Sequence, residues 1–162
     1  MFSIFKKKKK SDVITAYVSG KVVPVEKVND EVFSAKILGE GIGICPTEDM
    51  IVAPCDGEVV SVMDDTKHAL GIKTSNGMEI LIHIGINTVS MKGDGFELFT
   101  KTGESVKKGD KLISFNRELI KSNGLDDVVI MVITNSDQFE GLTFNTDIDA
   151  VSNETVILEI PK

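Results

Sequence analysis

The chain has 162 residues, a length that suits one domain with a core large enough to fold alone. Hydrophobic residues make up 41% and charged residues 27%, a composition typical of globular proteins and not of disordered ones. The net charge of -7 argues against a nucleic-acid-binding protein, and no apolar run reaches the ~20 residues of a membrane span. Cys45 and Cys55 lack the spacing of a metal or redox motif, and no secretory signal is recognisable, so we expect free thiols and a cytoplasmic protein.

The N-terminus differs in composition from the rest of the chain. Five consecutive lysines, Lys6 to Lys10, follow two phenylalanines and an isoleucine. We expect residues 1–12 to form a flexible, solvated tail and residues 13–162 to form the single domain. The alternative for the tail is a weak contact with an anionic membrane surface, at ~1 kcal/mol per basic residue.

Beyond the tail, short β-branched runs alternate with turn residues. This pattern predicts an all-β fold, an antiparallel sandwich or barrel. The dipeptide Asn76-Gly77 lies between two such runs and predicts a β-hairpin with a two-residue type I′ turn. The predicted strands contain residues 22–23, 42–44, 59–60, 70–73, 80–86, 111–115, 128–133 and 155–160.

Two short helices and one internal repeat complete the prediction. A helix is expected over residues 117–122, with Asn116 as its N-cap and Gly124 near its end. A helical turn is expected near residues 29–33. Residues 16–25 and 53–62 both follow the pattern A-x-x-x-G-x-V-V-x-V, which indicates a duplicated β-motif within one closed body.

The chain has only two histidines, His68 and His83. His83 lies within an apolar run, residues 80–86, where burying an imidazole costs free energy unless its nitrogens find partners. Imidazole is also the side chain whose ordinary pKa lies nearest to neutrality, so it can act as nucleophile or base near pH 7. Taken alone, each histidine is more often a structural residue than a catalyst, and the surrounding pattern decides between these interpretations.

That pattern is specific. Residues 81–86 read L-I-H-I-G-I, residues 88–96 follow T-V-x-x-K-G-x-G-F, and residues 66–69 read T-K-H-A. In order and spacing the chain closely resembles the glucose-type enzyme IIA component of the bacterial phosphoenolpyruvate-dependent sugar phosphotransferase system. The resemblance covers roughly residues 18–133.

The resemblance implies a phosphoryl carrier with an antiparallel β-fold. It assigns the phosphorylated nucleophile to His83, support of phosphoryl transfer to His68, and orientation of His68 to Thr66. The expected donor is the phosphocarrier protein HPr, and the expected acceptor is the IIB domain of a sugar permease. The resemblance implies no cofactor and no required metal, and it adds regulatory binding to other proteins according to phosphorylation state. In the family a backbone carbonyl, here that of Gly85, accepts a hydrogen bond from Nδ1 of the nucleophile.

The resemblance also implies a shallow apolar face around the histidines, with an acidic rim that meets basic partners. One departure from the family pattern is Asn87, where many members have an acidic residue. The residues assigned to the face and its rim are Val32, Phe33, Ile37, Leu38, Leu81, Asp30 and Asp94.

The hairpin predicts, without the family, that the histidines share a site. A two-residue turn at Asn76-Gly77 would pair His83 with Leu70 and place His68 as a diagonal neighbour on the same face. Three alternatives to a phosphoryl carrier share some of these features. A biotinyl or lipoyl carrier has similar hairpins, but Met91-Lys92-Gly93 is only half of its lysine motif. A zinc peptidase needs more histidines than two. A regulatory protein without phosphoryl transfer would use the same apolar face.

Overall fold

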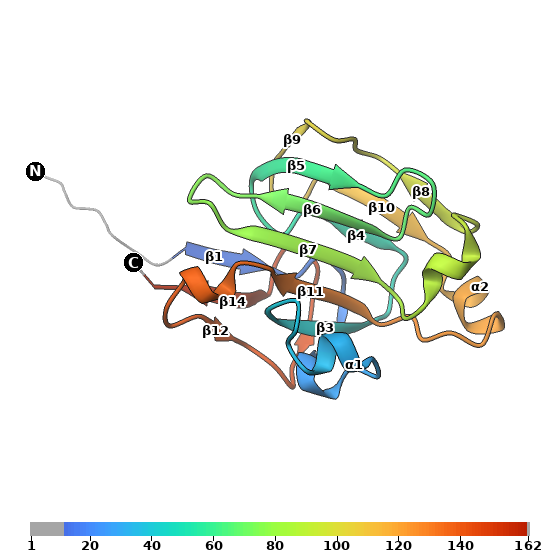
Figure 1. Ribbon diagram of the computed structural model, residues 1–162, viewed down its shortest axis with the longest axis horizontal. Helices are drawn as coiled ribbons and strands as arrows, with labels where there is room; N and C mark the ends of the chain where they lie inside the picture. The colour runs from blue at the N-terminus through green and yellow to red at the C-terminus, as the bar shows by residue number, and fades with distance from the viewer. Residues whose placement is uncertain (1–11, 162) are drawn as a thin grey trace, which may run out of the picture.

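The computed structural model describes residues 12–161, which form three antiparallel sheets (Figure 1). The largest has the order β13-β2-β3-β11-β7-β6-β5-β9, and the smaller sheets have the orders β4-β10-β8 and β1-β14-β12. This arrangement confirms the predicted all-β class. The strands are β1 (Asp12–Thr15), β2 (Gly20–Pro24), β3 (Glu40–Pro46), β4 (Met50–Val52), β5 (Gly57–Val62), β6 (Ala69–Lys73), β7 (Glu79–Ile84), β8 (Phe96–Leu98), β9 (Ser105–Val106), β10 (Lys111–Phe115), β11 (Val129–Ile133), β12 (Thr143–Phe144), β13 (Asp149–Ala150) and β14 (Val156–Ile160).

The strand β11 lies at the middle of the largest sheet, between β3 and β7, and all five of its residues are buried. Val129, Met131 and Ile133 face the main core, whereas Ile130 and Val132 pack into a second, smaller cluster with Phe33. The sequence of a strand that is buried on both faces is a continuous apolar run, because neither face carries polar residues that would produce an alternating pattern. The second cluster matters for function, since it supports the sheet face on which His83 lies.

The duplicated motif is visible as a local two-fold arrangement. Its two copies contain β2 and β5, which occupy the second position from either end of the largest sheet. The backbone N of Thr15 donates to the O of Pro54 at 3.1 Å, and the N of Val52 donates to the O of Tyr17 at 2.9 Å. With an offset of 37 residues between the copies (53 minus 16), these two bonds are the same bond made in both directions. The repeat predicted from the sequence is therefore a structural repeat.

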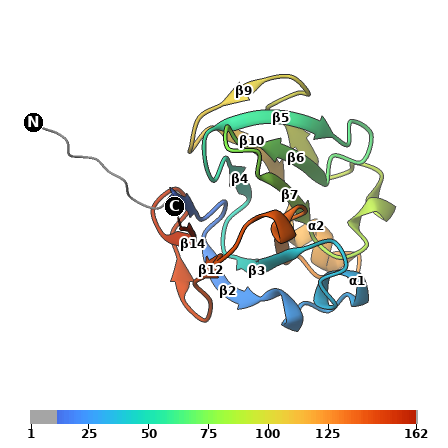
Figure 2. The same cartoon turned by 60° about the vertical axis from the view of Figure 1, so that its left-hand side comes forward.

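Both predicted helices form, and the one at residues 117–122 has the predicted cap. Helix α2 (Arg117–Ser122) begins after Asn116, whose side chain accepts a hydrogen bond from the N of Leu119, and Gly124 follows with a φ of 76°. Helix α1 (Glu31–Ser34) begins after Asp30, whose Oδ1 accepts from the N of Val32 and Phe33. Both views place α1 beside β3 and away from β5 and β9 (Figure 2). The other helical elements within residues 12–161 are the 3-10 helices η2 (Val25–Lys27), η3 (Thr88–Met91) and η4 (Ser136–Gln138).

The hairpin between β6 and β7 forms, but the predicted turn is wrong. Lys73 pairs with Glu79, so the loop has an odd number of residues, and Gly77 alone adopts a positive φ, of 88°. The N of Gly77 donates to the O of Thr74 at 3.0 Å. Because the N of Thr74 also donates to the O of Met78 at 3.0 Å, the loop has three residues, with a turn followed by a left-handed glycine, and it is not a type I′ turn. The pairing of the two strands is consequently shifted by one residue from the prediction.

The ends of the described chain lie side by side, since Asp12 pairs with Ile160 across β1 and β14. The predicted lysine-rich tail, residues 1–12, lies outside the described residues except for Asp12, which is the first residue of β1. Among residues 12–161, no helix is long and apolar enough to cross a membrane.

Candidate active site

His83 lies near the end of β7, on the outer face of the largest sheet. In β7 the residues Ile80, Ile82 and Ile84 point into the main core, whereas Leu81 and His83 between them are half-buried. The ring of His83 packs against Phe33 from helix α1, with centroids 5.0 Å apart. The imidazole is thus held on a rigid strand, with one side against an aromatic ring and another open to the surface.

The two imidazoles share one site, although the predicted register is wrong. Ala69, not Leu70, lies opposite His83, so a regular strand would point His68 to the inner face. Strand β6 instead begins at Ala69, so His68 lies outside it. The ring of His68 lies edge-on to that of His83 with centroids 4.8 Å apart. The small side chain of Ala69 opposite His83 leaves room for this second ring.

A tight turn before β6 brings His68 into this position. The N of Lys67 donates to the O of Met63 at 2.7 Å, and Lys67 adopts a left-handed φ of 58°. The O of His68 then accepts a hydrogen bond of 2.7 Å from the N of Ile84, which ties the two histidine segments together. Nδ1 of His68 is joined to Oγ1 of Thr66 at 2.8 Å, and this bond fixes the ring.

The left-handed conformation of Lys67 gives a testable consequence for stability. Lys67→Gly should keep or slightly raise the free energy of unfolding, because glycine adopts a positive φ without strain. Lys67→Val should lower it by about 1–2 kcal/mol, because a β-branched side chain resists this conformation. Urea unfolding of both variants tests this. Lys73→Val is the control, since Lys73 is exposed within β6 where valine is favoured. Equal stability of Lys67→Val and Lys67→Gly would show that the turn has another conformation.

Burial keeps both imidazoles neutral. The pKa of His83 is lowered to about 4, mainly by burial and then by the neighbouring His68, whereas the Gly85 backbone and Asp30 act in the opposite direction. Burial also lowers the pKa of His68, which is only 4% exposed. Nδ1 of His83 is buried and makes no hydrogen bond with any residue that the structure describes. The expected bond to the Gly85 carbonyl is therefore not formed, although this carbonyl is close enough to influence the ring.

The lowered pKa of His83 predicts how stability depends on pH. The unfolded chain takes up a proton near the ordinary pKa of 6.5, whereas the folded protein resists protonation down to about 4. The stability that comes from a neutral His83 is present above pH 6.5 and is lost as the pH falls from there toward 4. Urea unfolding at several pH values should show the wild type losing more stability over this interval than His83→Gln. Parallel curves for the two proteins would contradict the lowered pKa.

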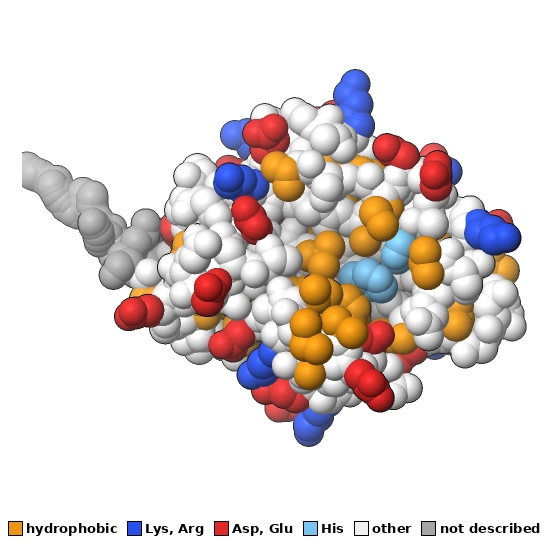
Figure 3. All heavy atoms as spheres, viewed as in Figure 1, with side chains coloured by type: hydrophobic (Ala, Val, Ile, Leu, Met, Phe, Trp, Pro, Cys, Tyr) orange, Lys and Arg blue, Asp and Glu red, His pale blue; other side chains and the backbone are white. Residues whose placement is uncertain are grey.

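The apolar face forms around the histidines, as Figure 3 shows for the hydrophobic side chains beside the two imidazoles. Val32, Ile37 and Leu38, in α1 and the loop before β3, are 43%, 70% and 38% exposed. The remaining residues assigned to the face, Phe33 and Leu81, are more buried, and Phe33 acts mainly as the support of His83.

The two carboxylates assigned to the rim have different surroundings. Asp30 caps helix α1 through Oδ1 and is near enough to raise the pKa of His83. Asp94 is exposed in the loop between η3 and β8. Asp30 therefore has a structural task as well as a place beside the imidazoles, and Asp94 is a surface charge.

Comparison with known proteins identifies the family. Residues 12–139 match the family described as phosphoenolpyruvate-dependent sugar phosphotransferase system, EIIA 1. The chain belongs to this EIIA family. It is 42% identical over 153 residues to a PTS system glucose-specific EIIA component of Bacillus anthracis, covering 94% of this chain and 92% of the relative. It is 40% identical over 160 residues to the protein of that name from Staphylococcus epidermidis, covering 99% and 96% of the two chains.

A solved structure agrees with the sequence relatives. The fold matches glucose permease IIA from Mycoplasma capricolum with a TM-score of 0.81 and 33% sequence identity, over 93% of this chain and 96% of that one. This EIIA chain is thus a component of the sugar phosphotransferase system with the fold expected from its sequence.

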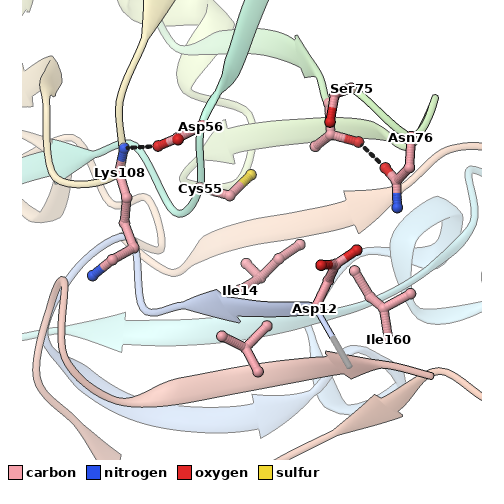
Figure 4. A pocket seen from close by; sticks show the side chains of 10 residues that line it. Asp12, Ile14, Cys55, Asp56, Ser75, Asn76, Lys108 and Ile160 are labelled. Atoms are coloured by element: carbon pink, nitrogen blue, oxygen red, sulfur yellow. Dashed lines mark hydrogen bonds between the residues drawn. The ribbon is translucent and has the colours of Figure 1, made fainter. Parts of the chain in front are cut away.

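The EIIA chain also has a pocket of about 350 Å³ that is separate from the histidines (Figure 4). It lies beside β1 and the tip of the β6–β7 hairpin, at the end of the hairpin opposite His83. Its lining includes Cys55, whose pKa is raised to about 12 by burial, so this thiol stays protonated at neutral pH. Asp56 is engaged as well, because its Oδ1 accepts from the N of Lys108 at 2.8 Å. None of the site residues assigned from the sequence lines this pocket.

Two contributors to the site were not assigned from the sequence. Lys67 lies within the motif T-K-H-A, but nothing in a single sequence predicts that a lysine adopts a left-handed backbone conformation. Thr88, whose hydroxyl donates to the carbonyl of Ile84 directly after His83, begins the T-V-x-x-K-G-x-G-F pattern, and its place just after a buried strand was the signal that could have identified it. Within residues 12–161, no three His, Cys, Asp or Glu side chains are grouped so that they could hold a metal ion.

Proposed function

We propose that this EIIA protein accepts a phosphoryl group from phospho-HPr on Nε2 of His83 and passes it to a sugar-specific IIB domain during sugar uptake. The observation that carries the proposal is the pair of neutral, edge-on imidazoles with centroids 4.8 Å apart, in a chain of the EIIA family. The relatives named as glucose-specific components support glucose as the sugar. The transfer takes place in the cytoplasm, and residues 13–162 act as one phosphocarrier domain.

The chemistry follows from the state of His83. With its pKa lowered to about 4, the ring is neutral at pH 7 and its free nitrogen has an electron pair available for attack. Nε2 attacks phosphorus, the new N–P bond forms, and the bond between phosphorus and the donor atom breaks, with its electron pair returning to the donor. The reverse sequence passes the group to the acceptor. The protein contributes position and electrostatics, and no metal takes part in these steps.

His68 assists by donating a hydrogen bond to the phosphoryl oxygens. For this its proton must be on Nε2, so the Thr66 hydroxyl donates to Nδ1 over the 2.8 Å that separates them. A threonine hydroxyl can fill that role because it is both a donor and an acceptor. Thr66 thus fixes the tautomer of His68, and the hydrogen bond from His68 positions the oxygens of the transferred phosphoryl group.

The partners dock on the apolar face around the histidines. Val32, Ile37 and Leu38 are exposed there, and exposed apolar side chains in one patch are typical of protein interaction sites. The net charge of -7, with Asp30 and Asp94 at the rim, favours partners with basic surfaces. Because phosphorylation adds negative charge at the centre of this face, regulatory proteins can distinguish the two states.

Mass spectrometry tests the proposal directly. Incubation with phosphoenolpyruvate, enzyme I and HPr should add the mass of one phosphoryl group, and peptide mapping should place it on His83. Omitting HPr is the control and should leave the protein unmodified. A protein that stays unlabelled in the complete mixture, or is labelled at another residue, would refute the proposal.

Chelation tests whether transfer needs a metal. Transfer from pre-formed phospho-HPr should proceed at an unchanged rate in excess chelator, because imidazole forms and breaks the N–P bond without a Lewis acid. Radiolabelled phospho-HPr allows the rate to be followed, and it avoids the magnesium required by enzyme I. Loss of transfer that is restored by added metal would show that the mechanism is wrong.

A further inference from the structure

The segment that follows His83 is fixed by an unusually complete set of contacts. The N of Ile84 donates to the O of His68 at 2.7 Å, the N of Gly85 to the O of Val128 at 2.7 Å, and the N of Ile86 to the O of Asp126 at 3.0 Å. Three successive peptides after the nucleophile are thus tied to two other parts of the fold. One further side chain, that of Thr88, also contacts this segment.

Thr88 is completely buried, which is uncommon for a polar residue in a turn. Its hydroxyl donates to the carbonyl of Ile84, the last residue of β7. Its methyl group lies under Gly85: a Cβ built on Gly85 would come within 2.4 Å of Cγ2 of Thr88. Both branches of the side chain therefore contact the backbone immediately after His83, and only glycine fits between them.

Gly85 has a φ of 77°, a left-handed conformation that glycine adopts without strain. The Gly85 carbonyl is near enough to the buried Nδ1 of His83 to favour a proton on the ring. A rotation of the Gly85 peptide would change which group faces Nδ1, and therefore which ring nitrogen carries the proton.

We infer that Thr88 is a positioning residue for His83: by holding the Ile84 carbonyl and the Gly85 backbone, it keeps the Gly85 carbonyl close to Nδ1 without a hydrogen bond between them, and leaves Nε2 free. The inference rests on the proposed function in one respect, namely that Nε2 is the reacting atom. Thr88 itself touches neither the imidazole nor the phosphoryl group. Its effect passes through the peptide that it anchors.

The test compares variants that separate the hydroxyl from the methyl group. Thr88→Val keeps the shape and removes the hydroxyl, whereas Thr88→Ser keeps the hydroxyl and removes the methyl group. Nitrogen NMR of the unphosphorylated protein reports the tautomer of His83 without any phosphoryl donor. We expect Thr88→Val to reduce the fraction of Nδ1–H tautomer and to slow phosphoryl uptake by roughly 10- to 100-fold, as expected for a small misplacement of a reacting group. Thr88→Ser should retain the wild-type tautomer and most of the uptake rate.

Each outcome distinguishes the inference from the proposed function. An unchanged His83 tautomer in a folded Thr88→Val protein overturns the inference, whatever the uptake rate. A His83 tautomer that is shifted in Thr88→Val and unchanged in Thr88→Ser supports the inference. This holds even if the wild type accepts no phosphoryl group, because that result would refute only the proposed function. If Thr88→Val does not fold, Thr88→Ala is compared with Thr88→Ser. That pair differs by the hydroxyl oxygen alone, and equal His83 tautomers in the two would overturn the inference.

Discussion

His83→Gln should fold normally and take up no detectable phosphoryl group from phospho-HPr. Glutamine is polar and of similar size, so it can occupy the half-buried position on the outer face of β7 beside Phe33. Its amide nitrogen has no electron pair available for attack on phosphorus. The change therefore removes the proposed nucleophile and leaves the strand, the main core and the neighbouring His68 in place.

The measurement is the transfer of radiolabel from pre-formed phospho-HPr, followed over time for the variant and the wild type. Circular dichroism and urea unfolding verify that the variant is folded. Lys73→Gln is a matched control, because it introduces glutamine on the adjacent strand β6 at an exposed position remote from the imidazoles. Full labelling of His83→Gln would show that another residue accepts the group and would remove the basis of the proposed mechanism.

Local signals determined the parts of the fold that the sequence predicts well. Helix α2 has the predicted bounds because Asn116 and Gly124 supply an N-terminal cap and a left-handed end, both of which act within a few residues. The repeat was recognisable because glycine and paired valines are needed at the same places in both copies. Two-residue strands such as β12 and β13 were missed, since so few residues show no alternation.

The prediction of a two-residue turn at Asn76-Gly77 was wrong because a contact with a residue distant in the sequence determines the loop. Nδ2 of Asn135 donates to the O of Gly77 at 2.8 Å, and its Oδ1 accepts from the N of Glu79 at 2.9 Å. This nearly buried side chain follows β11 and fixes the start of β7, and with it the number of residues in the loop. Local turn preferences favoured an even loop, but a contact across 58 residues selected an odd one.

The site shows the same limit. The hairpin correctly brought the two histidine segments together, but the predicted register would have placed His68 on a regular strand. In the structure the register differs by one residue, and the left-handed turn at Lys67 restores the approach of the rings. The apolar run around His83 also concealed its alternation, because the outer face of the sheet is itself apolar where α1 covers it. Both features depend on contacts between segments that one sequence does not reveal.

His68→Gln should separate acceptance of the phosphoryl group from its onward transfer. The nucleophile, its lowered pKa from burial and the apolar face remain in this variant, so uptake from phospho-HPr should stay within a few-fold of the wild type. His68 is 4% exposed and lies edge-on to His83 with ring centroids 4.8 Å apart, so in the proposed mechanism it is near enough to assist transfer from His83. Transfer to the IIB domain should slow by roughly 100-fold or more, the range for loss of one positioned hydrogen-bonding or proton-transfer group.

Rapid-quench measurement of both half-reactions tests this separation, with phospho-HPr as donor and then with purified IIB domain as acceptor. Thr66→Val supplies the matched comparison. It keeps the His68 ring but removes the hydroxyl bonded to Nδ1, so it should show the same defect in onward transfer to a smaller extent. Thr66→Ser keeps that hydroxyl and should behave like the wild type.

Onward transfer at the wild-type rate by His68→Gln would mean that the second imidazole packs beside the nucleophile without assisting it. Equal loss of both half-reactions would instead place His68 in the acceptance step, because the same hydrogen bond would then be needed in both directions.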